Sequence, residues 1–349
     1  MQKRIKIYFL LFIISVFNAG NLFAAEQFDV KSFIFSHIGD SYEWHITVIG
    51  EKEISVPLPV ILIDKENGIS FFVSSRLRKG ASYKGYRISE KGEYANKIVY
   101  TSASGKERRP VDLSITKNSL ALIINCSVLL ILILSAASWY RKDKQSAPKG
   151  FVGAMEMFIM DINDNVIKNA IGKGYEKYAP YLLTVFFFIL INNFMGLIPF
   201  FPGGANTTGN IAVTFVLALC TFAVISFSGT KEYWKEILWP NVPSWMKVPL
   251  PLMPAIEIFG VFTKPFALMI RLFANIMAGH TIILGLTSLV FVTVAMGAAT
   301  NMGMTMLSVL LTAFMLFVEL IVAYIQAYVF TLLSAVFIGL SRVQKHAIN

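Results

Sequence analysis

The last two thirds of the chain are a series of apolar runs separated by short breaks. A helix needs about 20 apolar residues to cross ~30 Å of hydrocarbon. The run from Ser119 to Tyr140 has this length and carries no charge, and two similar runs lie at about 180–198 and 210–229. The block from Pro254 to Arg342 has one break, near 297–303, and predicts two long helices forming a tilted hairpin. The pattern therefore predicts an all-α polytopic membrane protein with five transmembrane helices.

The segment from Glu26 to about Lys117 has a different pattern, with charged residues throughout. Apolar and polar residues alternate at 44–48 and 69–73, which is typical of half-buried strands. Turn-forming residues separate these stretches at 66–68, 78–80 and 91–92. We therefore expect a small β-rich domain at residues 26–117, before the membrane domain at 118–342.

The first 25 residues have the features of a secretory signal peptide. Lys3, Arg4 and Lys6 precede an apolar stretch that ends near Phe17, and Ala24 and Ala25 follow as small residues near a cleavage site. The prediction is a signal peptide at 1–25, so that the β-rich segment is exported. An uncleaved first membrane anchor is the alternative.

One further segment, residues 151–168, is neither a span nor a loop. Its apolar residues recur every three or four positions, with charged residues between them. This periodicity predicts a helix on the cytoplasmic surface of the bilayer. A helical arm in solution is the alternative.

Composition agrees with a membrane protein, because 55% of the 349 residues are hydrophobic, 15% are charged and the mean hydropathy is +0.61. The net charge is +10. Basic residues follow the first, third and fifth predicted spans, at 141–149, 231–247 and 342–345, while the other two loops have none. The positive-inside rule therefore places the N-terminus outside and the C-terminus in the cytoplasm. The charge is better explained by this orientation than by nucleic acid, which we do not expect as a partner.

The sequence shows no clear motif for binding a metal ion, a cofactor or a nucleotide. Cys126 and Cys220 both lie in apolar runs, so they indicate neither a disulfide framework nor a metal site. His37, Glu43 and His45 have no spacing typical of metal ligands. There is no Walker loop and no nucleophile paired with a base. We expect no cofactor, no metal and no catalytic activity in this chain alone.

Polar residues interrupt the last two apolar helices and mark the candidate site. An arginine near the middle of a span costs about 2.5–3.5 kcal/mol on insertion scales, so it normally faces a partner or a water-filled cavity. Arg271 is such a residue. The set that breaks the apolar pattern is Glu257, Lys264, Arg271, Asn275, His280, Glu319 and Gln326.

Helical geometry sorts these residues into faces. At ~100° per residue, Asn275 and Glu257 lie on the face of Arg271, whereas His280 lies about 180° away. In a tight antiparallel hairpin, Glu319 comes level with His280, and Gln326 with Arg271 or Asn275. A histidine and a carboxylate in a wet pocket can relay protons. The alternative is a buried ion pair that only positions the helices.

These residues carry a resemblance to a known family. The segment from Glu257 through Arg271-Leu272-Phe273-Ala274-Asn275 to His280 resembles the penultimate helix of subunit a of bacterial F-type ATP synthase, and Gln326-Ala327-Tyr328 resembles its final helix. Residues 193–199 and 207–210 are similar as well. The resemblance covers about residues 118–342.

The resemblance implies a proton-channel stator in the cell inner membrane, facing a rotating ring of c subunits and contacting the b subunit stalk and lipid. Arg271 matches the arginine that attracts a ring carboxylate and prevents a direct proton leak. Asn275, His280, Glu319 and Gln326 match positions of the outer half-channel, and Glu257 matches one on the cytoplasmic side. Many bacterial members have the histidine and glutamate exchanged, and the arrangement here is similar to the mitochondrial one.

Two other classes of function stay open from the residues. A secondary ion-coupled transporter would also bury Arg, His and Glu, but it would usually show an internal repeat with paired broken helices, which this sequence lacks. A structural membrane anchor for the exported domain would make Arg271 dispensable.

Overall fold

The computed structural model describes the chain at residues 29–49, 52–89, 92–101, 107–142, 148–198, 201–239 and 252–342. The predicted signal peptide lies outside these residues. The chain divides into two units. One consists of the residues up to Gly39 together with Ala274–Ala323, and the other of Asp40–Phe273 together with the residues from Tyr324 onwards.

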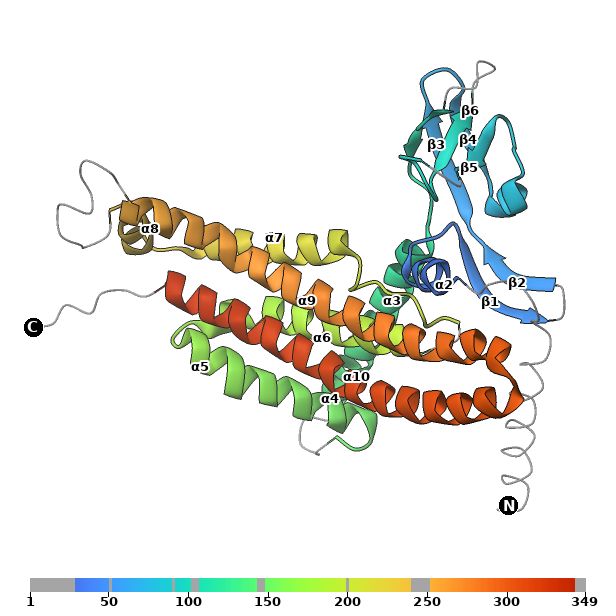
Figure 1. Cartoon of the computed structure of the whole chain (residues 1–349). Coiled ribbons are helices and arrows are strands. Elements are labelled where there is room, and N and C mark those ends of the chain that lie inside the picture. Colours follow the sequence, from blue (N-terminus) through green and yellow to red (C-terminus); the bar gives the residue numbers. More distant parts are fainter. Residues whose placement is uncertain are drawn as a thin grey trace, which may run out of the picture. The chain divides into compact units, whose positions relative to one another are not determined.

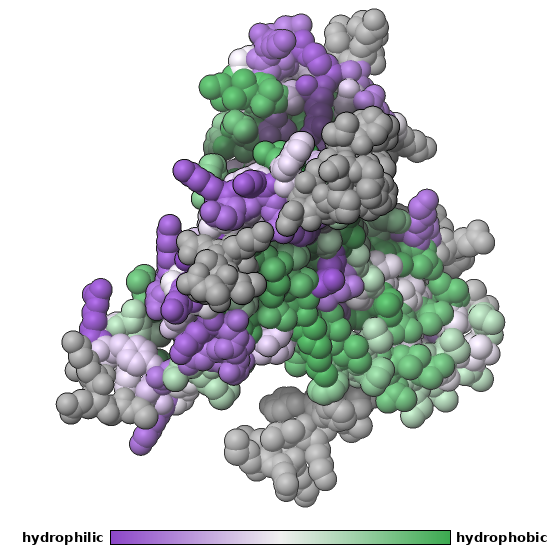
Figure 2. Space-filling model, turned by 90° about the vertical axis from the view of Figure 1, so that its left-hand side faces the viewer, coloured by the Kyte–Doolittle hydropathy of each residue, from purple (hydrophilic) through white to green (hydrophobic). Residues whose placement is uncertain are grey.

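Among the residues that the structure describes, five helices are long and apolar enough to cross a membrane. They are α3 (Lys117–Lys142), α6 (Ala179–Leu197), α7 (Ile211–Ser228), α9 (Leu252–Val292) and α10 (Ala298–Ser341). Hydrophobic side chains cover much of their surface, whereas hydrophilic ones gather over much of the β-rich part (Figure 2). The predicted fold class, with five membrane helices and a β-rich N-terminal segment, is confirmed.

The break between the last two helices is shorter than predicted. A 3-10 turn at Thr293–Met296 ends in Gly297, whose φ of +99° lies in the region that glycine adopts without strain. The expected break extended to Gly303, but this residue lies inside α10. The 3-10 turn and this glycine together reverse the chain, and α9 and α10 form an antiparallel hairpin (Figure 1).

A buried amide network joins α3 to α6 and to the loop before α7. Asn125 Nδ2 donates a hydrogen bond of 2.9 Å to Asn192 Oδ1, which also accepts one of 2.8 Å from Thr207. Thr208 donates similarly to Asn193, at 2.7 Å. Interhelical bonds of this kind hold apolar helices together where lipid supplies no hydrophobic driving force. Asn193, Thr207 and Thr208 thus have a structural role.

The segment after α3 is helical, as predicted, but not uniformly. It runs as α4 (Phe151–Met160), a π-helical turn (Asp161–Ile167) and α5 (Lys168–Ile171). The predicted apolar face contributes Met155 and Ile162 to the interior, where the segment packs against α3 and α6. Its location on the bilayer surface stays a prediction.

The N-terminal segment is β-rich, as expected. Its strands are β1 (Glu43–Ile49), β2 (Lys52–Pro57), β3 (Pro59–Asp64), β4 (Gly68–Val73), β5 (Tyr86–Ile88), β6 (Ile98–Thr101), β7 (Glu107–Arg108) and β8 (Val111–Asp112). They form a β1–β2 hairpin and two antiparallel sheets of order β4-β3-β8 and β5-β6-β7. The expected turn at 78–80 is instead the end of a 3-10 helix, Ser74–Gly80. The structure also has two short α-helices, α2 (Val30–Ile38) and α8 (Lys231–Leu238).

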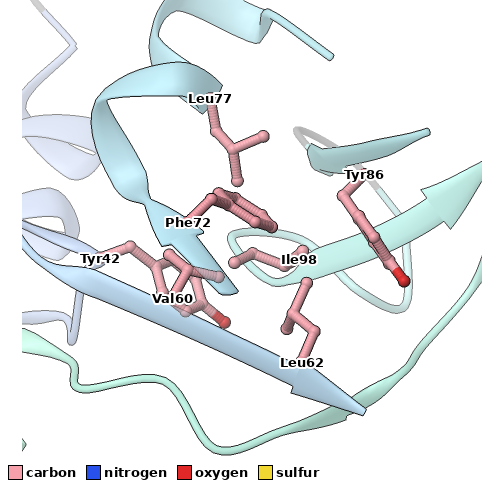
Figure 3. Packing of buried hydrophobic residues seen from close by; sticks show 7 residues of the cluster. All are labelled: Tyr42, Val60, Leu62, Phe72, Leu77, Tyr86 and Ile98. Atoms are coloured by element: carbon pink, nitrogen blue, oxygen red, sulfur yellow. The ribbon is translucent and has the colours of Figure 1, made fainter. Parts of the chain in front are cut away.

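The core of this segment lies between the two sheets. Alternation in β3 and β4 places Val60 opposite Phe72, with both side chains facing inward. Figure 3 shows the side chains pointing toward one another, and the cluster consists of Tyr42, Val60, Leu62, Phe72, Leu77, Tyr86 and Ile98. An ion pair of 2.6 Å between Arg108 and the buried Asp64 adds a link between the sheets.

The β1–β2 hairpin packs on the beginning of α3. Trp44 is buried against Ala121 of α3 and Ala205, and its ring contacts Phe201 edge-on at 5.2 Å. The backbone N–H of Asn118 donates a hydrogen bond of 3.0 Å to Asp40. The β-rich segment is therefore attached to the membrane helices by packing as well as by the chain.

Candidate functional site

α9 has an apolar exposed face that carries one arginine. Exposed residues recur every three or four positions, as expected for one side of a helix. Arg271 belongs to this face, whereas its neighbours Leu268 and Leu272 are buried on the other side. The large apolar members of the face are Ile256, Phe259, Phe262, Phe266 and Ile270.

Arg271 has no counter-ion within the described part of its own chain. Among the described residues it forms neither a salt bridge nor a hydrogen bond. Gln326, expected near it from the hairpin register, is 7% exposed and makes no hydrogen bond to it. Arg271 is therefore a guanidinium on an exposed apolar surface, open to a group from another molecule.

The structure brings His280 and Glu319 together. His280 Nδ1 lies 3.7 Å from Glu319 Oε1, as expected from the antiparallel hairpin. The Glu319 side chain is 3% exposed, and neither carboxylate oxygen has a hydrogen-bond partner among the described residues. Buried carboxylates are normally hydrogen-bonded, so this one is in a position to exchange protons with water or with a neighbouring base.

Gly279 lies at the candidate site, and the sequence reasoning missed it. A Cβ at this residue would lie 2.6 Å from Glu319 Oε1, whereas Cβ atoms in proteins essentially never come within 3.0 Å of another heavy atom. The absence of a side chain lets the Glu319 carboxylate lie directly on the backbone of α9, beside His280. Its position next to His280 was the only signal in the sequence.

Asn275 and Glu257 lie elsewhere on α9. Asn275 is exposed, like Arg271 one turn earlier. Glu257 is partly buried close to Tyr233 of α8, where burial and the charge of Glu257 together raise the pKa of the Tyr233 phenol. Lys264, which the sequence also singled out, is positioned by Phe337 of α10, with its Nζ 5.7 Å from the ring centroid.

A metal site is not formed by the described residues, among which no group of three His, Cys, Asp or Glu side chains comes together. Of the three N-terminal candidates, Glu43 binds Arg78 at 2.8 Å. The His37 ring nitrogen Nδ1 lies 2.8 Å from the Phe33 carbonyl oxygen.

Together these features define a polytopic membrane protein with an arginine exposed on an apolar helix face and a buried His–Glu pair in the same hairpin. This arginine has no ion-pair partner among the residues that the structure describes. The family ATP synthase A chain matches residues 120–339. The chain belongs to this family, which confirms the resemblance found in the sequence.

Similar proteins agree with this assignment. ATP synthase subunit a of Chlorobium phaeobacteroides is 42% identical over 243 residues, which are 68% of each chain. ATP synthase subunit a 2 of Chlorobaculum tepidum is 44% identical over 66% of this chain and 64% of its own length. ATP synthase subunit a of Myxococcus xanthus is 39% identical over 68% of this chain and 75% of its own.

The matched region of this chain thus spans about two thirds of the length of the first two relatives. The N-terminal segment matches a different family, at residues 33–118, described as Domain of unknown function (DUF8433). The chain therefore joins two families, and their boundary falls at the start of α3.

Proposed function

We propose that this chain is the proton-channel stator of a rotary ATP synthase, and that Arg271 faces the membrane-embedded carboxylates of a c-ring. The single observation that carries the proposal is that Arg271 is exposed within the apolar face of α9 and has no partner among the described residues. The other partners of the chain in this proposal are a b subunit stalk and membrane lipid.

The energetics require a partner of opposite charge. An arginine at mid-bilayer costs about 2.5–3.5 kcal/mol even on the mildest scales, and no described carboxylate of this chain forms an ion pair with it. A carboxylate on a neighbouring ring offsets this cost when it is charged, but not when it is protonated. Arg271 therefore holds each ring site only while the site lacks its proton, which prevents a direct leak between the two sides.

The outer half-channel contains His280 and Glu319. Their approach to 3.7 Å allows the imidazole and the carboxylate to exchange a proton. Asn275, exposed one turn beyond Arg271, and the buried Gln326 line the path to the ring. A proton that enters here neutralises the ring carboxylate as it leaves Arg271.

The cytoplasmic half-channel contains Glu257. Glu257 lies near Tyr233 of α8, and α8 is in the loop whose lysines indicate the cytoplasmic side. Each proton that crosses the membrane supplies about 2.3 kcal/mol per 100 mV. Several crossings together drive ATP synthesis in the soluble head, and this chain translocates ions without being an enzyme itself.

The orientation follows from the same charges. The N-terminus lies outside the inner membrane and the C-terminus in the cytoplasm, with residues 1–25 acting as a signal peptide and the β-rich segment exported. The membrane domain begins at residue 118.

The test is ATP-driven proton pumping in inverted vesicles that carry the assembled complex. Arg271→Ala should abolish pumping while the ATPase activity of the head persists, because the ring site loses its counter-ion. Ile270→Ala, on the same exposed face, is the matched control and should retain pumping. Persistent pumping in the Arg271 variant would indicate a structural anchor, and a wild-type complex without ATP-driven pumping would favour a secondary transporter.

A further inference from the structure

The β4-β3-β8 sheet has a second face, on the side away from its core. Val60, Leu62 and Phe72 point to the core, so the residues between them point the other way (Figure 3). The pairing of β3 continues beyond β8, because the backbone N–H groups of Leu113 and Ile115 donate hydrogen bonds of 3.0 and 3.1 Å to carbonyl oxygens of β3. We call this second face, which has three rows of three residues across the strands, the outer face. Its rows are Ile69, Ile63 and Val111; Phe71, Ile61 and Leu113; and Val73, Pro59 and Ile115.

Every residue of the outer face is apolar. Three of them are largely exposed, Ile69 at 75%, Phe71 at 67% and Val111 at 62%. The acidic residues of these strands, Asp64 and Asp112, point to the core side, where each accepts a hydrogen bond from another side chain. A sheet with one face in water normally has its polar residues on that face. Because the pattern is reversed here, we expect the outer face to be covered, and Figure 2 shows hydrophobic side chains gathered amid hydrophilic ones on the β-rich part.

The area of the outer face suits a contact between two identical sheets. With side-chain areas on the order of 100–200 Å², the exposed fractions leave roughly 500 Å² of apolar surface. A standard dimer buries about 800 Å² on each partner, and about 65% of a homodimer interface is apolar, which again gives about 500 Å². Two sheets pack face to face in this way about 10 Å apart, with their side chains interdigitating.

The absence of charge also favours a second copy. In a two-fold contact, a residue at the centre of the face meets the same residue of the other copy. A charged group there would meet its own charge, and like charges placed opposite each other destabilise a contact. The nine residues of the outer face carry no charge, so two copies of it can pack together.

The link to the membrane favours a second copy over lipid. Ile115 is still paired with β3, and Lys117 begins α3 two residues later. Every copy therefore holds its outer face at a similar distance from the membrane, where two copies can meet. The most exposed row is also the farthest from α3, because Val111 is six residues before Lys117, or up to about 20 Å away. A face that bound lipid should instead be most exposed next to the helix.

We propose that the outer face of the β4-β3-β8 sheet pairs with the same face of a second copy of this chain, so that two membrane domains are joined through their β-rich segments. This inference goes beyond the proposed function, because it assigns a partner to the β-rich segment and does not depend on proton transfer.

Crosslinking of single cysteines in membranes that contain the intact chain tests this pairing. Cys126 and Cys220 are first replaced by alanine. Ile61 is the middle residue of the middle row, so it meets its own counterpart in a two-fold contact. A bismaleimide that spans the ~10 Å between packed sheets should therefore shift most of the Ile61→Cys chain to the mass of a dimer.

Ile54→Cys is the matched control, because Ile54 is an apolar residue of β2, 42% exposed, outside the outer face. It should stay monomeric under the same conditions. Equal dimer yields at the two positions, or no dimer at Ile61→Cys, would overturn the inference. Crosslinking of Ile61→Cys to a different protein would overturn it as well.

A charge exchange separates a second copy from every other occupant. Ile61→Glu and Ile61→Lys each place like charges at the centre of the contact, so each variant alone should lose co-purification of two differently tagged copies. Co-expression of the Glu variant with the Lys variant should restore it, because opposite charges then meet. Limited proteolysis as in the wild type checks that each variant is folded, since Ile61 points away from the core. Pairing of either variant alone, or no recovery in the mixture of folded variants, would show that this face does not join two copies.

Discussion

Replacement of Gly279 by alanine tests the geometry of the His280–Glu319 pair. The new Cβ would lie 2.6 Å from Glu319 Oε1 and 2.9 Å from Cδ. An ordinary contact begins near 3.4 Å, so the carboxylate must retreat by about 0.8 Å. It can do so because it is the end of a flexible side chain, and the cost in folding stability should therefore stay near 1 kcal/mol, the low end for overpacking.

The functional cost should be larger than the structural one. Misplacement of a proton-transfer group by about 1 Å can reduce a rate by up to about 100-fold. We expect ATP-driven proton pumping in Gly279→Ala vesicles to fall by roughly 10- to 100-fold, measured as the initial rate per assembled complex. Thermal unfolding of the purified complex should change little.

Gly285→Ala is a matched control on the same helix, because a Cβ there meets no atom within 4 Å. It should pump at the wild-type rate. Glu319→Asp, introduced beside Gly279→Ala, shortens the acidic side chain and should restore part of the activity. Equal pumping by the Gly279 and Gly285 variants would show that the pumping rate does not depend on the position of the Glu319 carboxylate.

Two further predictions concern the β-rich segment of the intact chain, measured by limited proteolysis. Leu62→Ala empties a fully buried site and should destabilise the segment by about 2–5 kcal/mol, whereas its partly exposed neighbour Ile63→Ala should cost less than about 1 kcal/mol. Burial raises the pKa of Asp64, but hydrogen bonds, chiefly from Arg108, outweigh burial and hold this pKa below its ordinary 3.8. The folded segment therefore favours the charged carboxylate, and its stability should fall as the pH drops below about 4. Asp64→Asn should abolish this acid dependence, and an unchanged dependence would exclude Asp64 as its source.

The five membrane helices could be predicted from the sequence, because a charge-free run of about 20 residues leaves few other options. Even the contact of His280 with Glu319 follows from helical spacing once the chain reverses near residue 297. The π-helical turn at Asp161–Ile167 had no signal in the sequence. The amide network of Asn125, Asn192 and Thr207 depends on three separated segments and was equally invisible.

By itself, the sequence determined where the chain enters the membrane, which segment is β-rich, and that Arg271 has no acidic neighbour within two turns on its helix. These are local properties of hydrophobicity and spacing. Only the tertiary structure decided that Arg271 is exposed on α9 and that Gly279 leaves room for the Glu319 carboxylate. It also decided that neither oxygen of this carboxylate has a hydrogen-bond partner among the described residues. The physical reason is that exposure and hydrogen bonding depend on which surfaces the packed helices leave open, and helical periodicity defines a face without saying what covers it.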